Sequence, residues 1–439
     1  MTTRVPVDYV ATSNWAGNVK WSRSEVLEPT DAKQLAELIK NAKGSVRVIG
    51  TGHCFSPIAN TTGTHIRLRN ESFGKIEFLK DEGLVRFGAG VTYTKLLEAC
   101  EEEGVSIMNA PSLPHITVVG SVMTGTHGSG WNKPTMGNEV VAVEFVRSDG
   151  TLDEITTESE ELGWVVQSWG SAGVVTGMTM KTYPIHQVYK QIFLRPDWDG
   201  IIDNLEQVFQ SGDYVSLFCR WTRYGGEFNS AWVGHSSGKA PANVRDLFPD
   251  SEELKEGESV HPVPELDGRN CIAVGLSSVN RCQYHFIPSG VPSSGVGMEL
   301  QTEFFLPVEK TAAALRDLSA RSKDFGYLCV VTELRVMTGD QLPLSVIQGP
   351  SSQRFVGIHM TWHYRQDRVV VALRDIIQPI YKKYGPLRPH VGKLFVMDDS
   401  LQYLFDKYDE LKERFDPTGR FSGVTVATAV PDGINEAKL

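Results

Sequence analysis

The stretch RVIGTGHCFS, residues 47–56, decides how the first part of the chain is interpreted. Its β-branched lead-in predicts a short strand, and Gly50 and Gly52 let the backbone approach a ligand closely. A Rossmann fingerprint would need a third glycine and an immediate helix. Here His53 and Cys54 follow instead, and Pro57 disfavours a long helix. The loop therefore does not lead into the helix of a dinucleotide-binding fold. The alternatives are a turn whose backbone approaches a phosphate, or a catalytic Cys–His pair.

The length and charge of the chain limit its class of function. At 439 residues it exceeds one compact core, so we expect two domains. A net charge of -10 argues against a general nucleic-acid-binding protein. There is no apolar run of about 18 residues, so no membrane span is predicted, and the N-terminus lacks the layout of a signal peptide. The 6 cysteines lack CxxC spacing, which fits a reducing compartment better than a disulfide framework or a zinc site.

Apolar periodicity and turn residues predict α+β structure in the first part of the chain. Residues 28–44 are typical of a helix with Thr30 as its N-cap, and residues 92–104 of a second helix that ends at a glycine. Asp149 and Gly150 are predicted to form the turn of a β-hairpin, because they separate two β-rich runs.

The middle of the chain alternates strands with longer helices. The alternation runs from residue 188 to about 385, with helices predicted at 309–324 and 367–383. It predicts one large, mainly antiparallel sheet that carries helices on one face. Residues 236–270 are rich in proline, glycine, serine and charge, so we expect a long surface loop there.

A second glycine-rich loop spans residues 120–130, where successive small residues leave backbone N–H groups free to bind an anion. Together the two loops resemble the phosphate loops of the vanillyl-alcohol oxidase-type FAD flavoproteins, most closely the alditol oxidase and sugar-lactone oxidase branch. The matching segments follow the family order over nearly the whole chain: SNWAGN (13–18), RVIGTGHCFSPIA (47–59), SLPHITVVGSVMTGTHGSG (112–130), ELR (333–335), IHMTW (358–362) and RPHVGKLF (388–395).

This resemblance implies an α+β fold of two domains. An FAD-binding domain is expected at residues 1–185 and a substrate domain at 186–390, the latter built on a large antiparallel sheet carrying helices. A C-terminal segment, 391–439, is expected to return to the first domain.

The resemblance also implies FAD as the cofactor, attached covalently through its 8α-methyl group to His53. From the residues alone, the alternative is a histidine that only packs in the turn. Cys54 is expected to pack or to line the phosphate loop, because doubly linked relatives take their cysteine from the second loop, and none lies between 101 and 218. The cofactor-binding residues implied are Val48, Ile49, Gly50, Thr51, Gly52, His53, Cys54, Ser112, Thr117, Gly120, Ser121, Thr124, Thr126, His127, Gly128, Ser129 and Val174.

Two predicted strands carry polar residues at alternate positions. Glu333 and Arg335 are two apart, so both side chains point to one face, and their apolar neighbours favour burial over a surface ion pair. By the same rule His359, Thr361 and His363 share a face. No carboxylate or further histidine sits at ligand spacing, so no metal site is expected.

The resemblance assigns roles to these strands and to two other segments. Glu333 or His359 is the expected base for the hydroxyl proton, while Arg335 and Lys393 would orient hydroxyl groups and stabilise charge. Lys393 would also support negative charge on the reduced flavin, and His363 is expected to be structural. The substrate-binding residues implied are Ser112, Glu333, Arg335, Thr361 and Lys393.

Three departures from the family pattern concern the size and reactivity of the site. Val391 replaces a tryptophan, which would enlarge the pocket, and SGVTV at 422–426 lacks a usual asparagine. Pro111 stands at a position that borders the route of dioxygen to the flavin. These departures leave the size of the substrate open.

The expected function is an FAD-dependent oxidase of polyols such as xylitol or sorbitol. Hydride would pass from a CH–OH carbon to flavin N5, and dioxygen would reoxidise the flavin to give hydrogen peroxide. The alternative within the branch is an aldonolactone oxidase or dehydrogenase acting on a gulono-, galactono- or arabinonolactone. A non-catalytic carbohydrate-binding protein on the same fold would be colourless. A Cys–His hydrolase is disfavoured, because adjacent residues in a tight turn cannot orient as nucleophile and base.

The last residues, Ala437-Lys438-Leu439, are close to the Ser-Lys-Leu pattern that the peroxisomal import receptor reads. An oxidase that forms peroxide belongs in a compartment with catalase. We therefore expect a peroxisomal protein if the source is eukaryotic, and a cytoplasmic one otherwise. No nucleic-acid or membrane partner is expected.

Overall fold

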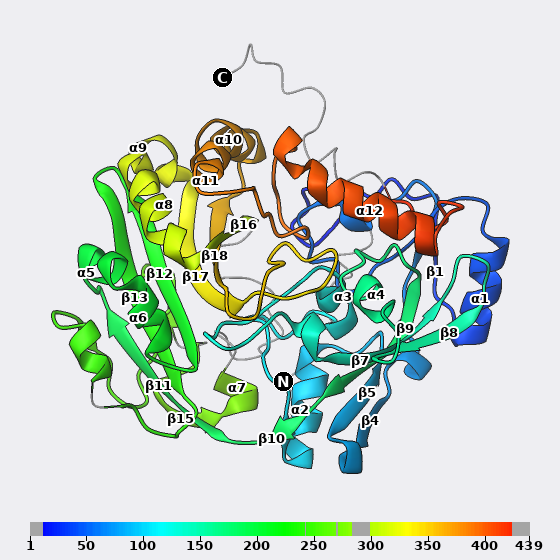
Figure 1. Cartoon of the computed structure of the whole chain (residues 1–439), viewed down its shortest axis with the longest axis horizontal. Helices are drawn as coiled ribbons and strands as arrows, with labels where there is room; N and C mark the ends of the chain where they lie inside the picture. Colours follow the sequence, from blue (N-terminus) through cyan, green and yellow to red (C-terminus); the bar gives the residue numbers. More distant parts are fainter. Residues whose placement is uncertain (1–11, 242, 269–270, 283–298, 424–439) are drawn as a thin grey trace.

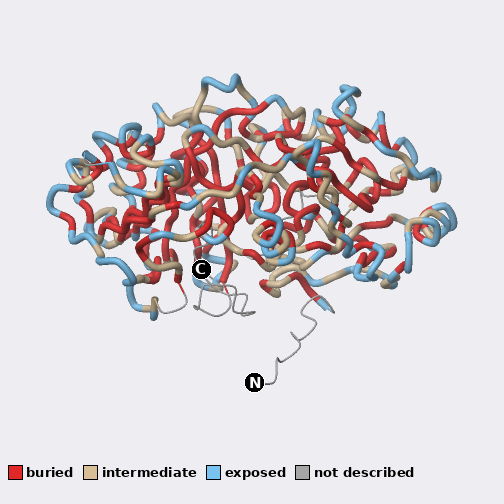
Figure 2. Tube along the Cα trace, turned by 90° about the horizontal axis from the view of Figure 1, so that it is seen from below, coloured by how far each residue is buried: buried red, intermediate tan, exposed pale blue. Residues whose placement is uncertain are grey.

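The computed structural model describes residues 12–241, 243–268, 271–282 and 299–423 of the chain. Two β-sheets form the centres of two halves that lie side by side (Figure 1). Buried residues run through the middle of both halves, and exposed residues gather at the outer rim (Figure 2). The two-domain α+β fold predicted from the sequence is confirmed.

The first half is built on a 5-stranded antiparallel sheet with the order β4-β5-β9-β7-β8. A small parallel sheet, β1-β3-β2, lies beside it and leads directly into the first glycine loop. The strands of this half are β1 Glu25–Leu27, β2 Val46–Val48, β3 Thr64–Ile66, β4 Ile76–Leu79, β5 Leu84–Gly88, β6 Val105–Ser106, β7 Val140–Val146, β8 Leu152–Thr156, β9 Val174–Lys181 and β10 Tyr183–Pro184. Its helices are α1 Ala32–Asn41, α2 Tyr93–Glu103, α3 Val118–Met123 and α4 Leu162–Val165.

The second half is built on an 8-stranded sheet with the order β14-β11-β13-β12-β17-β18-β16, where β15 also pairs with β11. Its strands are β11 Gln187–Leu194, β12 Tyr214–Thr222, β13 Gly225–His235, β14 Glu252–Glu253, β15 Gly275–Ser278, β16 Glu299–Pro307, β17 Cys329–Thr338 and β18 Arg354–His363. Helices α5 Trp198–Asp203, α6 Leu205–Gln210, α8 Val308–Ala320 and α9 Ser322–Phe325 pack on one face (Figure 1), which confirms the predicted arrangement. The short helix α7 Val279–Cys282 follows β15.

The C-terminal helix α12, Gln402–Phe415, lies over the first half (Figure 1). Tyr408 stacks on Trp169 with ring centroids 4.9 Å apart, and its hydroxyl lies 2.8 Å from the hydroxyl of Ser171. The buried Arg47 donates a hydrogen bond of 2.9 Å to the carbonyl of Phe421. The end of the chain thus packs against the strand that leads into the first glycine loop.

Two predicted features have the expected local causes. Helix α2 begins at Thr92, whose hydroxyl accepts from the backbone N–H of Lys95, and ends at Gly104 with a φ of 71°. Strands β7 and β8 form the predicted hairpin, and Gly150 in its turn has a φ of 87°. A left-handed conformation of this kind favours glycine, which has no Cβ.

Two predicted helices differ in detail. The N-cap of α1 is Asp31 rather than Thr30, because the Asp31 carboxylate accepts from the backbone N–H of Gln34 at 2.9 Å. The helix predicted at 367–383 is α10 Gln366–Ala372, a π-helical segment Leu373–Ile377, and α11 Gln378–Lys382. Pro379 near the start of α11 has no N–H for a regular helical hydrogen bond, which accounts for the irregularity.

The prediction of a surface loop at 236–270 is wrong for its central part. His261, Pro262 and Val263 are buried, and Val263 packs in an apolar cluster with Phe218 and Trp232 of the large sheet. Proline, glycine and charged residues dominate the composition of this segment, so a single buried valine leaves little trace in the pattern.

Within the described part of the chain, no helix is long and apolar enough to cross a bilayer. The same residues contain no group of at least 3 histidine, cysteine, aspartate or glutamate side chains that could hold a metal ion. Cys100, Cys219, Cys271 and Cys329 are buried free thiols, and Cys54 is a half-buried free thiol.

Candidate active site

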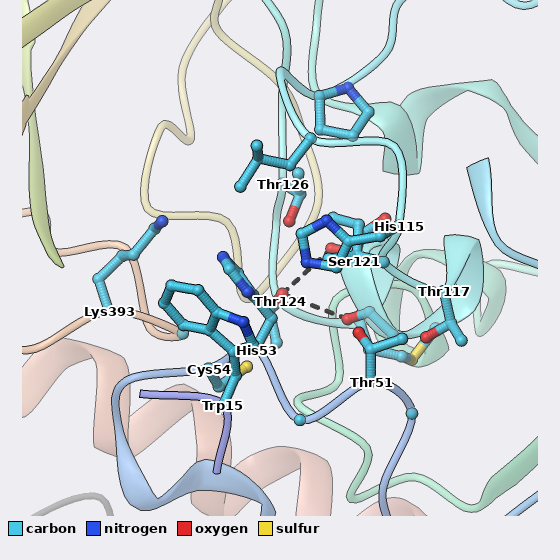
Figure 3. A pocket seen from close by; sticks show the side chains of 18 of the residues that line it. Trp15, Thr51, His53, Cys54, His115, Thr117, Ser121, Thr124, Thr126 and Lys393 are labelled. Atoms are coloured by element: carbon cyan, nitrogen blue, oxygen red, sulfur yellow. Dashed lines mark hydrogen bonds between the residues drawn. The ribbon is translucent and has the colours of Figure 1, made fainter. Parts of the chain in front are cut away.

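A cavity of about 770 Å³ is enclosed by both glycine loops and by one face of the large sheet. Its volume lies within the range of roughly 300–1,000 Å³ that is usual for cofactor and small-molecule sites. The first loop contributes Val48 to Cys54 without a gap, and Lys393 enters from the C-terminal part of the chain (Figure 3). The cavity thus brings together segments that are more than half the chain apart.

The first loop lies directly against the segment that leads into the second loop. A Cβ added at Gly50 would lie 2.4 Å from Oγ1 of Thr117, so no larger residue fits there without displacing Thr117. Gly52 has a φ of 67°, which again favours glycine. The two glycines of the first loop are therefore required by the contact with Thr117 and by the turn.

His53 lies at the centre of the cavity wall with its ring among other rings (Figure 3). The ring centroids of Trp15, His115 and Phe55 are 4.8 Å, 5.1 Å and 5.6 Å away. Both ring nitrogens of His53 are buried and have no hydrogen-bond partner. Burial, reinforced by His115 and Lys393, holds the pKa of His53 well below its usual range, so the ring is neutral.

This arrangement fits the cofactor that the sequence resemblance implies. A neutral imidazole with two unpartnered nitrogens is a nucleophile held at a cavity of suitable volume, and an unsatisfied buried polar atom calls for an explanation. Cys54 offers no such chemistry, because burial raises the pKa of its thiol to about 11. A protonated Cys54 thiol, and a His53 ring without a hydrogen-bond partner, support neither a thiolate nucleophile nor a Cys–His pair.

The second loop and its approach place most of the predicted cofactor residues on the cavity. Thr124 donates to the carbonyl oxygens of Gly120 and Ser121 at 3.3 Å and 3.2 Å, which fixes the turn after α3 (Figure 3). Predicted residues of this region that line the cavity are Ser112, Thr117, Gly120, Ser121, Thr124, Thr126 and His127. Predicted residues outside its lining are Gly128, Ser129 and Val174, although Gly173 and Val175 line it. Ser129 instead donates to the carbonyl of Val215 on β12, and Val174 is buried in the core.

A grid of polar side chains covers the face of the large sheet that is turned to the cavity. These side chains lie together because directly paired residues of neighbouring strands share a face. Glu333 on β17 pairs with His359 on β18, and Val331 pairs with Thr361. Glu303 on the edge strand β16 also pairs with His359. The predicted residues Glu333, Arg335, His359, Thr361 and Lys393 all line the cavity, whereas His363 is exposed.

Arg335 connects this grid to the first half of the chain. Its guanidinium donates to Oγ of Ser112 at 3.2 Å and lies 3.6 Å from the Glu333 carboxylate and 3.5 Å from the Glu303 carboxylate. Arg335 is therefore held between two carboxylates, and its guanidinium also contacts the segment that precedes the second loop.

Lys393, His359 and Gln301 form a second polar group, over β16. Nζ of Lys393 donates to Oε1 of Gln301, and Nε2 of His359 lies 3.2 Å from the same oxygen. Nε2 of Gln301 donates to Glu299 at 2.6 Å, so the amide oxygen is the acceptor toward Lys393, and Nε2 of His359 also lies 3.4 Å from Nζ of Lys393. Burial and the Lys393 charge lower the pKa of His359 to about 3, and burial lowers that of Lys393.

Glu303 is a site residue that the sequence interpretation missed. Its side chain is 1% exposed, and Oε1 lies 3.0 Å from Nε2 of His127 in the second loop. Nδ1 of His127 lies 2.8 Å from the carbonyl of Gly128, so the ring bridges Glu303 and the backbone of the second loop. Burial alone would raise the pKa of Glu303, but His127 and Arg335 hold it well below its usual range. Glu303 is thus an ionised link between the two halves.

Other cavity residues were also not predicted from the sequence. Gln301 and Glu299 alternate with Glu303 along β16, and this spacing of polar residues in an apolar strand was the available sign. His261 and its neighbours line the cavity although their loop was predicted to be exposed. Val391, predicted to enlarge the pocket, is buried and lies outside the cavity lining.

Comparison with known proteins agrees with this geometry. Two family descriptions match: an FAD binding domain at residues 24–156 and D-arabinono-1,4-lactone oxidase at residues 299–428. The chain is 30% identical to an alditol oxidase of Streptomyces sp., over 94% of this chain and 97% of that protein. It is 24% identical to the L-gulonolactone oxidase of Mus musculus, over 93% and 95% of the two chains. The solved cholesterol oxidase of B. sterolicum shares the fold, with a TM-score of 0.76 at 11% identity over 95% of this chain and 96% of that one.

Proposed function

We propose that this chain, which belongs to the alditol oxidase and aldonolactone oxidase branch of the vanillyl-alcohol oxidase-type FAD oxidases, oxidises polyols such as xylitol or sorbitol. Members of this branch are oxidoreductases that act on CH–OH groups with oxygen as the acceptor. The observation that carries the proposal is the polar grid of Glu333, Arg335, Thr361 and Lys393 on the wall of the cavity that also holds His53.

An extended chain of hydroxyl groups needs both donors and acceptors at intervals along its length. Arg335 and Lys393 offer N–H donors, Glu333 offers an acceptor, and the hydroxyl of Thr361 offers both. Strand pairing spaces these groups regularly, since Val331 lies beside Thr361 and Glu333 beside His359. A linear polyol can therefore exchange its hydrogen bonds to water for bonds to this wall.

Bound FAD would supply the hydride acceptor and the route of electrons to dioxygen. Of the two bases considered from the sequence, we propose Glu333 as the group that takes the hydroxyl proton. Burial and the Lys393 charge lower the pKa of His359 to about 3, which makes this ring a weak proton acceptor. Arg335 beside Glu333 keeps the carboxylate oriented, and Lys393 holds positive charge on the opposite side of the grid.

We also propose that FAD is attached covalently through His53. What supports this is the neutral ring with two unpartnered nitrogens at the cavity wall. The residues that would hold the rest of the cofactor are those of the two loops and Thr117, whose side chain leaves no room for a Cβ at Gly50. Reoxidation by dioxygen would yield hydrogen peroxide.

Oxygen consumption distinguishes the substrate classes. Purified protein should consume dioxygen with xylitol or sorbitol and leave gulono- and galactonolactone unoxidised. The second candidate function, an aldonolactone oxidase, is favoured by the family match at residues 299–428. Rapid oxygen uptake with a lactone and none with xylitol would replace the first proposal with the second.

Peroxisomal targeting stays a separate proposal, because Ala437-Lys438-Leu439 lies outside the described residues. A fluorescent reporter fused to residues 430–439 should enter peroxisomes of a eukaryotic cell through the import receptor. A diffuse cytosolic signal would contradict it.

A further inference from the structure

A second histidine, His115, lies against the ring of His53. The two ring centroids are 5.1 Å apart, and the rings meet edge to face at an interplanar angle of 77°. Both side chains line the cavity (Figure 3). Nε2 of His115 is buried and has no hydrogen-bond partner, as is true of both ring nitrogens of His53. Two imidazoles in contact thus leave buried nitrogens unpaired, which is rare in a folded protein unless the groups take part in chemistry.

Backbone hydrogen bonds fix the position of both histidines. The carbonyl that precedes the first histidine, that of Gly52, accepts from the N–H of Trp15 at 2.8 Å. The carbonyl that precedes the second, that of Pro114, accepts from the N–H of Thr94 at the start of α2, also at 2.8 Å. The contact between the rings therefore depends on two separately anchored segments of the chain.

The other neighbours of His53 cannot accept a proton. The rings of Trp15 and Phe55, which also contact it, have no basic nitrogen. The adjacent Cys54 keeps its own proton, because burial raises the pKa of its thiol to about 11. Among these neighbours, His115 is the one with a basic nitrogen.

The two imidazoles are matched as donor and acceptor of a proton. A neutral imidazole that attacks carbon through one nitrogen becomes an imidazolium, and the N–H on its other nitrogen then has to lose its proton. Burial holds the pKa of His53 well below its usual range, so this imidazolium releases its proton readily. Burial also lowers the pKa of His115 to about 4, so the ring is neutral at pH 7 and can accept the proton. A polyol hydroxyl is a far weaker acid, for which such a ring is a poor base.

We propose that His115 is the base that takes the proton of His53 while the bond to the 8α-methyl carbon of FAD forms. This inference rests on the proposed covalent attachment. With the flavin written as Fl–CH3, the steps are His53–H + Fl–CH3 → His53–CH2–FlH2 and His53–CH2–FlH2 + O2 → His53–CH2–Fl + H2O2. One N–H and one C–H bond break and one C–N bond forms. The flavin takes up two electrons and both hydrogens, and dioxygen then removes them.

The rate of attachment tests this role directly. Full-length protein is produced under riboflavin limitation, FAD is added in air, and acid-stable flavin is followed by its fluorescence in denaturing gels. His115→Asn keeps a polar side chain of similar size and has no basic nitrogen, so it should attach flavin about 10²–10⁴-fold more slowly than the wild type. Attachment at the rate of the wild type overturns the inference.

The matched control is Trp15→Phe. Trp15 packs on the same ring, with centroids 4.8 Å apart, and supplies no base, so its replacement should slow attachment far less than His115→Asn does. Added imidazole should restore the rate in His115→Asn, because it supplies the missing base, and should leave Trp15→Phe unchanged. Equal slowing in the two variants, or no rescue by imidazole, overturns the inference.

Failure of this inference differs from failure of the proposed attachment. If the wild type releases all its flavin in acid, no bond to His53 forms and the attachment itself is wrong. If the wild type keeps its flavin in the acid pellet and His115→Asn acquires it equally fast, the attachment stands and His115 is not its base.

Discussion

Replacing Glu303 by glutamine tests whether an ionised carboxylate holds the two halves together. The glutamine keeps the shape and one acceptor oxygen but removes the charge between His127 and Arg335, whose nitrogens lie 3.0 Å and 3.5 Å from Oε1. At an effective dielectric constant of about 20, the contact with the Arg335 guanidinium is worth about 5 kcal/mol before the cost of burying the charges.

The net loss of stability is smaller than that figure. Breaking a buried ion pair by removing one partner typically costs about 3–5 kcal/mol. Arg335 keeps Glu333 as a partner, and the amide oxygen still accepts a hydrogen bond, so we expect Glu303→Gln to lose about 3 kcal/mol. At about 2 °C per kcal/mol, this corresponds to a Tm lowered by roughly 6 °C. Glu303→Gln should change kcat more than KM, with a lower kcat, because Arg335 loses one of the two carboxylates that orient it.

The control for this variant is Glu227→Gln. Glu227 pairs with Arg220 at 2.8 Å on the surface, where both side chains are almost half exposed, and such pairs contribute about 0–1 kcal/mol.

Tm of the holoproteins is measured at pH 7 and pH 4. Because the folded-state pKa of Glu303 is lowered, its stabilisation is present above the unfolded pKa of about 4.3 and is lost as the pH falls through the folded value. The difference in Tm between the wild type and Glu303→Gln should therefore become smaller as the pH falls below about 4.3. A Tm of Glu303→Gln within about 2 °C of the wild type at pH 7, with unchanged kcat, would refute the reasoning. Such a small shift corresponds to a loss of less than about 1 kcal/mol.

Three further predictions concern the cofactor, the lysine and the buried histidines. Acid precipitation should leave yellow flavin in the pellet of the wild type and release it from His53→Ala; free flavin from both proteins would disprove the covalent attachment. Lys393→Met should lower kcat/KM for xylitol by about 10²–10³-fold, the range for loss of one charge-stabilising donor, with flavin content unchanged; activity near that of the wild type would remove Lys393 from the site. Burial lowers the pKa values of His359 and His390 to about 3, below the unfolded value of about 6.5. Their neutral forms stabilise the fold above pH 6.5, and this contribution should fall by about 1.4 kcal/mol per histidine and pH unit as the pH drops from about 6.5 toward 3. A Tm that is constant between pH 6.5 and 5 would contradict those pKa values.

Local sequence rules predicted the features that depend on neighbouring residues. The glycines of the first loop, the hairpin turn at Asp149 and Gly150, and the shared face of Glu333 and Arg335 each follow from residues close in the chain. The missing third glycine and the early proline excluded a dinucleotide helix, and only a 3-10 turn, Pro57–Ala59, follows the loop.

Features that depend on strand order were out of reach. Glu303 belongs to the site because β16 pairs with β18 and faces the second loop, and sequence spacing on β16 does not reveal either neighbour. Val263 and Pro262 line the cavity because a polar loop folds over one face of the sheet, which its composition did not indicate. In both cases tertiary contacts outweigh the local pattern.

The central claim is that a polyol bound on the grid beside His53 reduces the flavin held in the cavity. Anaerobic mixing of the purified yellow protein with xylitol tests this most directly, through the visible absorption band of oxidised flavin. The account predicts that xylitol bleaches the band fully and that air restores it. A band that xylitol and sorbitol leave unchanged, but that L-gulonolactone bleaches, would contradict it.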